Sequence, residues 1–332
     1  MRNVVILGMH RSGTSMVAEA LASGGIYVGE SAELLTGQED NPHGFWERED
    51  VVTLDDAILA GNAATWYRPP ENSPVASPQQ TDAIASIVDA MPADRSWLIK
   101  DPRQVLTWPL WRDAVPDAVL VFVYRGPLAV AASLQRRNGF PLSLGICLWQ
   151  YYNLLAIAAL QGRDVICLSY EEVAASPRET LSRLLDQLVD YGVSCERQLD
   201  AGIFDASLGH SGASNNVAAR SLLSDSQHRL ISYCEALCNN GELPPLPAMD
   251  ASLWPRLDDL GAALAPLATV LETRIQLDEM SALCDERTGE RDESLGQFRQ
   301  LESEHAALAS AHHDEVSRHE DLQGQHATLT AE

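Results

Sequence analysis

The feature that most constrains the fold is an apolar run that leads into a glycine loop near the N-terminus. Residues 4–15 read VVILGMHRSGTS, with Gly8 and Gly13 five positions apart. A buried strand, such a loop and a helix are the parts with which parallel α/β sheets bind phosphate groups. The nucleoside-triphosphatase version has a lysine before its last serine or threonine, but here Thr14 takes that place and Arg11 stands inside the loop. The sequence therefore predicts an anion-binding loop that is not built for ATP.

Alternating strand and helix patterns continue after this loop. Apolar runs predict strands at residues 3–8, 97–100, 118–124 and 165–169. Helical patterns occupy residues 14–24, 50–61, 78–91, 127–137, 144–161, 175–192 and 217–239. This alternation predicts an α/β fold, a P-loop-type parallel sheet flanked by helices.

The loop residues have the chemistry of a site for a tetrahedral anion. Glycines such as Gly13 let the backbone approach the ligand closely, and the start of the following helix presents N–H groups. Arg11 adds a guanidinium group that is able to donate two hydrogen bonds to one tetrahedral anion. The hydroxyl groups of Ser12, Thr14 and Ser15 add more donors. The alternative is an ordinary turn that happens to contain glycines. Such a turn does not need a buried strand directly before it, whereas a phosphate-binding loop does.

A second cluster of basic and hydroxyl side chains follows the strongest predicted strand. Arg125 comes at the end of that strand, where open α/β sheets bind ligands. Ser133 and Arg137 lie one helical turn apart on the helix after it. These three residues predict a second anion site, with exposed surface arginines as the alternative.

The C-terminal part has a different pattern. Four prolines lie within residues 241–255 and predict a linker, so we expect a main domain at 1–240 and a helical extension at 256–332. Within the extension, histidines recur every seven residues beside a leucine track, at His305, His312, His319, His326, Leu301, Leu308, Leu322 and Leu329. This heptad pattern predicts a coiled-coil helix that associates with another copy of the chain.

The heptad histidines have two interpretations. They favour a weak oligomerising stalk, in which polar residues at the seam set the register. A pH-sensitive or metal-binding coiled coil is the alternative. One helix alone does not chelate a metal through residues seven apart, because they lie about 10 Å apart along its axis.

Bulk properties narrow the class of protein. The 332 residues carry a net charge of −24, which disfavours nonspecific nucleic-acid binding. The N-terminus has no signal-peptide pattern, and no apolar segment is long enough to predict a membrane span, so we expect a cytoplasmic protein. The six cysteines include no C-x-x-C pair and are expected to be free thiols, and no metal cluster is predicted.

Taken together, these motifs resemble the sulfotransferases that use 3′-phosphoadenosine 5′-phosphosulfate (PAPS). Residues 11–15 (RSGTS) look like their 5′-phosphosulfate loop, and Arg125…Ser133…Arg137 looks like their 3′-phosphate site. The chain's one lysine lies in Lys100-Asp101-Pro102, which is similar to a motif of tyrosylprotein sulfotransferases. Tyr170-Glu171-Glu172-Val173 followed by Pro177 resembles their Tyr-Glu-x-Leu/Val stretch, and residues 41–47 (NPHGFWE) resemble a stretch of bacterial members. The matches come in the family's order and cover about residues 1–240.

The resemblance implies transfer of a sulfuryl group from PAPS to a hydroxyl or amine, with no metal required. It implies that Tyr170 lies by the nucleotide, and that Arg11 and Lys100 stabilise charge on the sulfuryl oxygens and on the leaving phosphate. A carboxylate is expected to take the acceptor's proton. Glu47 is the first choice, because its apolar neighbours would raise its pKa; Glu30, near the position of the base in the tyrosylprotein enzymes, is the second, and His43 is a third.

The acceptor class is left open by the sequence. A glycan, glycolipid or small metabolite is expected rather than a protein tyrosine, and tryptophan and tyrosine side chains such as Trp66 and Tyr67 are able to stack on a ring. Two other functions stay open. One is a P-loop small-molecule kinase, which would need Mg²⁺; the other is a non-catalytic scaffold that works through its coiled coil.

Overall fold

The computed structural model describes residues 1–35, 44–196, 223–264 and 318. The chain divides into one compact unit, Met1–Ala265, and a second unit, Pro266–Glu332. The predicted heptads and coiled coil fall in the second unit, outside the described residues, and so stay a prediction.

A parallel sheet of four strands forms the centre of this unit, in the order β2-β1-β3-β4. Its strands are β1 (Val4–Leu7), β2 (Leu98–Lys100), β3 (Val119–Tyr124) and β4 (Val165–Ser169). In the register of the sheet, Ile6 pairs with Lys100 of β2 and with Val121 of β3. The predicted strands and the predicted α/β class are confirmed. Because β2 and β3 lie on opposite sides of β1, the carboxyl ends of β1 and β3 form the switch point at which such sheets bind ligands.

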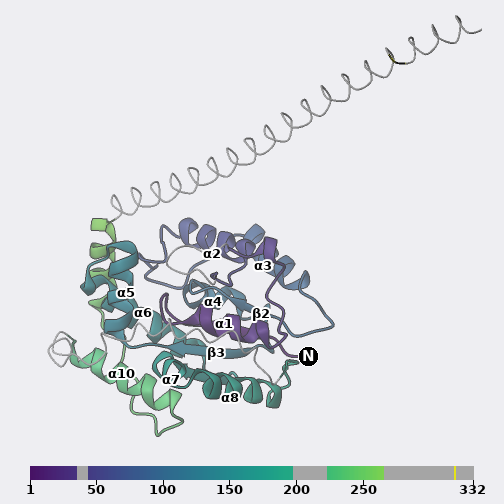
Figure 1. The fold of residues 1–332 in the computed structure, drawn as a ribbon. Helices are drawn as coiled ribbons and strands as arrows, with labels where there is room; N and C mark the ends of the chain where they lie inside the picture. The colour runs from purple at the N-terminus through teal and green to yellow at the C-terminus, as the bar shows by residue number, and fades with distance from the viewer. Residues whose placement is uncertain (36–43, 197–222, 265–317, 319–332) are drawn as a thin grey trace, which may run out of the picture. The chain divides into compact units, whose positions relative to one another are not determined.

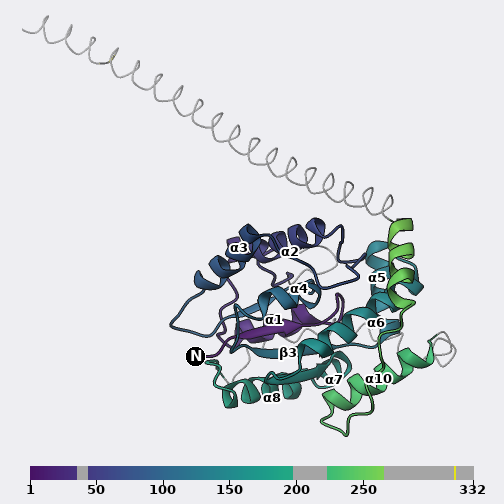
Figure 2. The same ribbon diagram turned by 180° about the vertical axis from the view of Figure 1, so that it is seen from behind.

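The helices flank the sheet on both faces (Figures 1 and 2). In both views α2 and α3 lie on one side of the sheet and α7 and α8 on the other. Their bounds are α1 Thr14–Ser23, α2 Glu49–Gly61, α3 Pro78–Asp89, α4 Gln104–Trp111, α5 Pro127–Asn138, α6 Leu142–Ala159, α7 Tyr170–Ala175, α8 Pro177–Asp190 and α10 Asp225–Cys238.

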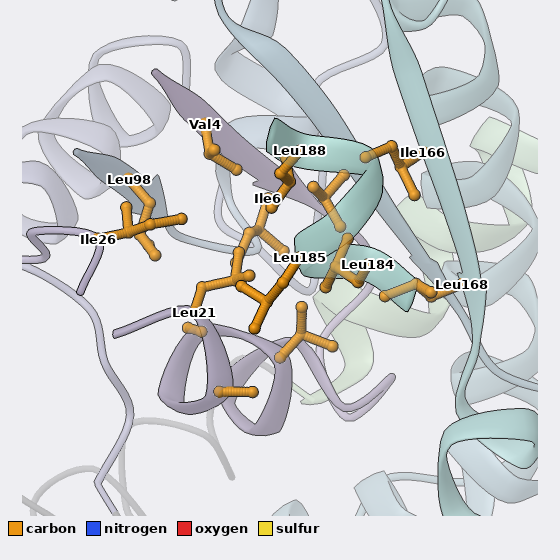
Figure 3. Packing of buried hydrophobic residues seen from close by; sticks show 14 of the residues in the cluster. Val4, Ile6, Leu21, Ile26, Leu98, Ile166, Leu168, Leu184, Leu185 and Leu188 are labelled. Atoms are coloured by element: carbon orange, nitrogen blue, oxygen red, sulfur yellow. The ribbon is translucent and has the colours of Figure 1, made fainter. Parts of the chain in front are cut away.

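One layer of the core fixes α1 and α8 against the sheet. Figure 3 shows Ile6 of β1 and Leu168 of β4 packed with Leu21 of α1 and Leu184 of α8. These side chains are at most 1% exposed, and burying each contributes roughly 1.5–3 kcal/mol. The position of α1, and hence of the loop before it, is set by this layer.

Helix α6 is the most apolar helix among the described residues. It has the length and mean hydropathy, 1.3, of a membrane-spanning segment, although the sequence analysis identified no such segment. In the structure 72% of that stretch is buried inside the protein. Its Trp149 donates to the backbone oxygen of Arg125 at 2.8 Å, so α6 acts as a core helix beneath the end of β3.

Some predicted helices differ from the observed ones. The helix expected at 175–192 is α8, which starts at Pro177, and the short helix α7 before it was not predicted; Ser176 departs from helical geometry between the two. The helix expected at 217–239 is described from Asp225, where Ser224 caps it. Helix α4, which contains Pro109, was not predicted at all.

The predicted linker ends in a helix. Residues 241–250 form no regular element, and a helical segment covers residues 253–264. Trp254 donates to the backbone oxygen of Pro69 at 3.0 Å, and Asp258 forms an ion pair with Arg68 at 2.6 Å. This segment therefore packs against Arg68 and Pro69, and the proposed division at residues 240 and 256 stays a prediction.

Candidate active site

The loop between β1 and α1 has backbone positions that favour glycine. Gly13 has φ of 93°, and a Cβ atom there would lie 2.5 Å from the ring of Tyr170. A Cβ atom on Gly8 would lie 2.7 Å from the backbone oxygen of Val123. No side chain among the described residues caps α1, which begins at Thr14. The loop is thus pressed against β3 and Tyr170, and the start of α1 presents its N–H groups as an anion site would.

Arg125 connects this loop to the end of β3. Its Nη1 donates to the backbone oxygen of Arg11 at 3.0 Å, and its guanidinium lies 3.9 Å from the centre of the Tyr170 ring. Its Nε has no partner among the described residues. Burial lowers the pKa of Arg125, and the neighbouring Tyr170 and Glu171 oppose that shift. A buried guanidinium with a spare donor is ready to bind an anion.

Arg11, inside the loop, contacts the second predicted anion site. Its Nε donates to Ser133 Oγ at 2.9 Å. Ser133 is buried in α5, and Arg125 is 8% exposed. The structure therefore brings together Arg11, Arg125, Ser133 and Tyr170, which come from four separate segments of the chain.

Lys100 and Glu47 form a buried ion pair beside the loop. Lys100 Nζ donates to Glu47 Oε1 at 2.5 Å, to the backbone oxygen of Phe45 at 2.9 Å and to Ser15 Oγ at 3.0 Å. These contacts use the three hydrogens of the ammonium group. Burial raises the pKa of Glu47, and the charge of Lys100 opposes that rise. One lysine thus joins a candidate base to the first turn of α1.

A strained turn supports this pair. Trp46 has φ of 56°, in the left-handed region that few side chains adopt, at a cost of about 1–3 kcal/mol. The turn lies between Phe45 and Glu47, both of which contact Lys100. Strain held at such a point indicates a functional position.

Comparison with known families agrees with this geometry. The sequence model of the sulfotransferase family matches residues 3–190, more than half of the chain. The chain belongs to the sulfotransferase family. The match spans every strand of the sheet, the glycine loop, the Lys100–Glu47 pair and Arg125.

Solved structures with a resemblance to this family member include other sulfotransferases. A sulfotransferase from Alicyclobacillus acidocaldarius is 20% identical, with 77% of this chain and 99% of that chain covered and a TM-score of 0.43. The sulfotransferase domain of the Synechococcus PCC 7002 olefin synthase is 18% identical, with 79% and 96% covered and a TM-score of 0.39. A sugar kinase from Janibacter sp. HTCC2649 is 19% identical, with 57% and 95% covered and a TM-score of 0.30. At these TM-scores the three structures do not indicate a function for this chain. A comparison with curated protein sequences found no match.

The other predicted site residues of this sulfotransferase, Arg137, Glu30 and His43, are not described in contact with Arg11, Arg125 or Lys100. Arg137 is on α5, with its guanidinium 5.4 Å from the centre of the Phe45 ring, and its place in a phosphate site stays a prediction. Glu30 is exposed and caps the 3₁₀ turn Ser31–Glu33, together with Glu33. His43 lies outside the described residues. Of the candidate bases, Glu47 alone is described in contact with Lys100.

His10 is a buried polar residue of the site that the sequence analysis did not single out. Its ring centre lies 4.4 Å from that of Trp66, and its Nε2 has no partner among the described residues. Burial, and then the nearby charges of Arg103, Arg137, Lys100 and Arg11, lowers the pKa of His10 well below its usual range. The imidazole is therefore neutral and adds no positive charge. Its position beside Arg11 was visible in the sequence, but its burial against Trp66 was not.

A cavity of about 340 Å³ lies beside the ends of β3 and β4 and is also lined by residues of α5 and α10. It is lined by residues that flank Arg125 and Tyr170, and it includes the carboxylates of Glu171 and Glu235. Two carboxylates make this cavity a poor site for a phosphate. Among the described residues, no cluster of three or more potential metal ligands is present.

Proposed function

We propose that this sulfotransferase moves a sulfuryl group from PAPS to a hydroxyl or amine of a glycan, glycolipid or small metabolite. The observation that carries the proposal is the contact of Arg11 with both Ser133 and Arg125. It joins the anion site at the start of α1 to a second one at the end of β3. A donor with anionic groups at two separate positions, such as PAPS, suits this pair of sites better than a ligand with a single phosphate chain.

The residues present fit such a donor. Ser12, Gly13 and Thr14 would hold the phosphosulfate end through the loop, and Ser15 and Lys100 adjoin the same end. Arg125, with its unpartnered Nε, and Ser133 would hold the second phosphate, and Tyr170 would lie along the nucleoside. PAPS supplies an activated sulfuryl group whose transfer is expected to proceed in line, without a metal.

Glu47 and Lys100 would perform the proton and charge chemistry. Glu47 is the proposed base, because its buried carboxyl has a raised pKa and so holds a transferred proton better than an exposed one. Lys100 reaches from Glu47 to Ser15 and would stabilise charge that develops near the loop. Glu30 as base, a cytoplasmic location and association through the coiled coil stay predictions.

The first test is calorimetric titration with adenosine 3′,5′-bisphosphate and with ADP, each without magnesium. We expect the bisphosphate to bind and ADP to bind much more weakly, because only the bisphosphate reaches both anion sites. Preference for ADP or ATP that needs magnesium would instead favour the kinase, in which Lys100 would stand in for the missing loop lysine. Binding of neither nucleotide would favour the scaffold.

A pair of variants locates the second anion site. Arg125→Ala is expected to weaken bisphosphate binding by about 10- to 100-fold, the worth of a charge-assisted hydrogen bond. Arg112→Ala removes the same charge from an exposed residue that pairs with Asp113, and serves as the control. Equal affinities of the two variants would remove Arg125 from the site.

A further inference from the structure

The cavity beside the ends of β3 and β4 is lined by residues other than those of the proposed nucleotide site. None of its described lining residues comes from the glycine loop, and neither Arg125 nor Tyr170 is among them. Its volume of about 340 Å³ lies at the small end of the range, about 300–1,000 Å³, of cavities that hold small ligands. The cavity is therefore large enough for a second, compact ligand.

The walls of this cavity are mostly apolar. Leu128 of α5 and Ile231 of α10 line it, together with Pro127, Ala129 and Leu223. Small-molecule sites typically combine such walls with a few polar groups that fix the orientation of the ligand. A ligand with an apolar body would gain free energy from the surface that it removes from water here.

The polar part of the lining is acidic. Glu171 and Glu235 are the only charged side chains among the described lining residues. Glu171 Oε1 accepts from the backbone nitrogen of Gly126 at 3.1 Å, and its Oε2 accepts from Ser169 Oγ at 3.0 Å. Both donors are neutral, so the carboxylate keeps its charge, and each oxygen has a further lone pair for another donor. These features favour a ligand that is a cation and donates hydrogen bonds.

Tyr124 supplies a second, independent feature that points to a ligand. It lines the cavity and is only 3% exposed, yet its hydroxyl has no hydrogen-bond partner among the described residues. A buried polar group without a partner is costly. Burial, and then the neighbouring Cys234, Glu235 and Glu171, raises the pKa of Tyr124. The phenol therefore stays protonated, and its oxygen is able to accept from a ligand in the cavity.

Arg125 is the nearest basic residue to consider, because it lies within electrostatic reach of Glu171. Its guanidinium is 3.9 Å from the centre of the Tyr170 ring and donates to the backbone oxygen of Arg11. Within the described part of the chain, no ion pair joins Arg125 to Glu171. The charge of Glu171 is thus not neutralised inside the cavity.

We propose that this cavity binds a small organic cation, a protonated amine attached to a compact apolar ring or branched chain. The ammonium group would donate to Glu171, Glu235 and the Tyr124 oxygen, and the apolar body would contact Leu128 and Ile231. Binding forms and breaks no covalent bond. The ligand is distinct from the sulfuryl acceptor, because the proposed base does not line this cavity.

Three probes of one shape test the class of ligand. The full chain is titrated by calorimetry at neutral pH and physiological salt with cyclohexylammonium, cyclohexanol and cyclohexanecarboxylate, without nucleotide. Cyclohexylammonium should bind about tenfold more tightly than cyclohexanol, the worth of a hydrogen bond to a charged group, and the carboxylate should not bind. Equal affinities of the ammonium and the alcohol, or no binding of any probe, would overturn the proposal.

A charge-matched pair of variants tests where the ammonium probe binds. Glu235→Gln should weaken its binding by about tenfold. Glu242→Gln removes the same charge from an exposed residue outside the lining and should bind as the wild type does. Equal losses in the two variants would show that the probe responds only to the overall charge of −24, which is incompatible with a site in the cavity.

Two further substitutions test the walls and the hydroxyl. Ala129→Leu places a larger side chain in the cavity and should abolish binding, whereas Ala132→Leu, on the same helix but outside the lining, should not. Tyr124→Phe should weaken binding several-fold without lowering the unfolding midpoint, since the hydroxyl loses no partner within the chain. Wild-type affinity in both Ala129→Leu and Tyr124→Phe would place the probe elsewhere.

A competition experiment separates this site from the proposed function. Cyclohexylammonium should still bind in the presence of saturating adenosine 3′,5′-bisphosphate, because the cavity shares no described lining residue with the proposed nucleotide site. Displacement of the probe by the bisphosphate would assign the cavity to the nucleotide and contradict the proposal. The titrations with the three probes need no nucleotide, so a failure of bisphosphate binding would count against the proposed function alone.

Discussion

At the scale of single residues, the Glu47–Lys100 contact is the point on which the proposed chemistry depends. Glu47→Gln keeps an oxygen for Lys100 but removes the base. Turnover of PAPS with an acceptor found by screening phenols and sugars should fall by roughly 10²–10⁴-fold, the usual contribution of a general base. The affinity for adenosine 3′,5′-bisphosphate should stay unchanged. Glu49→Gln, an exposed position on α2, is the control, and wild-type turnover in Glu47→Gln would remove Glu47 from the reaction.

The pH dependence of turnover follows from the same residue. Glu47 works as a base only when it is ionised, so the rate should rise with pH as the carboxyl loses its proton. Because burial raises the pKa of Glu47 above the 4.5 of an ordinary glutamate side chain, this rise should be centred above pH 4.5. The profile of kcat against pH checks it, and a rise centred below 4.5 would contradict the buried base.

The stability of the Asp55→Asn variant gives a further pH test. The folded chain holds a proton on Asp55 beyond the pH at which the unfolded chain, with a value near 3.8, releases it. The contribution of wild-type Asp55 is therefore complete below that value and is lost as pH rises toward the higher folded pKa. Asparagine does not titrate, so the variant should gain stability relative to the wild type as pH rises. Urea unfolding at pH 4 and at higher pH measures this difference, and a constant difference would contradict it.

The sequence identified some site residues and missed others for a physical reason. Arg125 and Lys100 lie at the ends of apolar strands, and the geometry of a parallel sheet brings such ends together. Asp55 and His10 are different, because only burial makes them unusual. Asp55 is enclosed by Thr107 and Trp111, more than fifty positions further along the chain, and no local pattern in the sequence encodes that contact.

At the scale of elements, the strands were predictable and the short helices were not. The strands β1 and β3 are buried along their whole length, so their apolar runs are unmistakable. Helix α4 has eight residues and contains Pro109, and a proline inside a helix weakens its sequence pattern. The helix is held by tertiary contacts instead, among them the hydrogen bond from Trp111 to Asp55.

The backbone geometry of the glycine loop is testable by a substitution at Gly13. Gly13→Ala places a methyl group 2.5 Å from the Tyr170 ring in a backbone conformation that alanine avoids. The loop or the ring must move, so bisphosphate affinity should fall by about tenfold or more, at a cost of roughly 1–2 kcal/mol in stability. Calorimetry and thermal unfolding measure the two effects. Gly162→Ala is the matched control, since Gly162 also has positive φ but has open space around it; equal bisphosphate affinities would show that the loop geometry does not matter.

At the scale of the whole molecule, four basic side chains of an acidic protein lie near one buried residue, His10. The net charge is −24, yet Arg11, Lys100, Arg103 and Arg137 all lie near His10. A local cationic site within an acidic chain admits a compact anion while the rest of the surface repels long polyanions. This distribution agrees with a nucleotide donor and with an acceptor of low negative charge.

The C-terminal boundary of the compact unit is testable by truncation of the chain. The compact unit runs to Ala265, and the helical segment 253–264 contacts Pro69 through Trp254 and Arg68 through Asp258. Arg68 and Pro69 lie two and three positions after Trp66, whose ring contacts His10. A chain cut after residue 265 should keep the wild-type unfolding midpoint and bisphosphate affinity. A chain cut after residue 240 should unfold at a lower temperature.

The double variant Trp254→Phe with Asp258→Asn separates loss of these contacts from loss of chain length. In the full chain it removes the hydrogen bond to Pro69 and the ion pair with Arg68, and it should lower the midpoint in the same direction as the cut after residue 240. The ion pair is partly exposed and worth little by itself, so most of the change should come from the indole. If the cut after residue 240 behaves like the wild type, residues 1–240 are a complete domain and the 253–264 helix is an accessory to it.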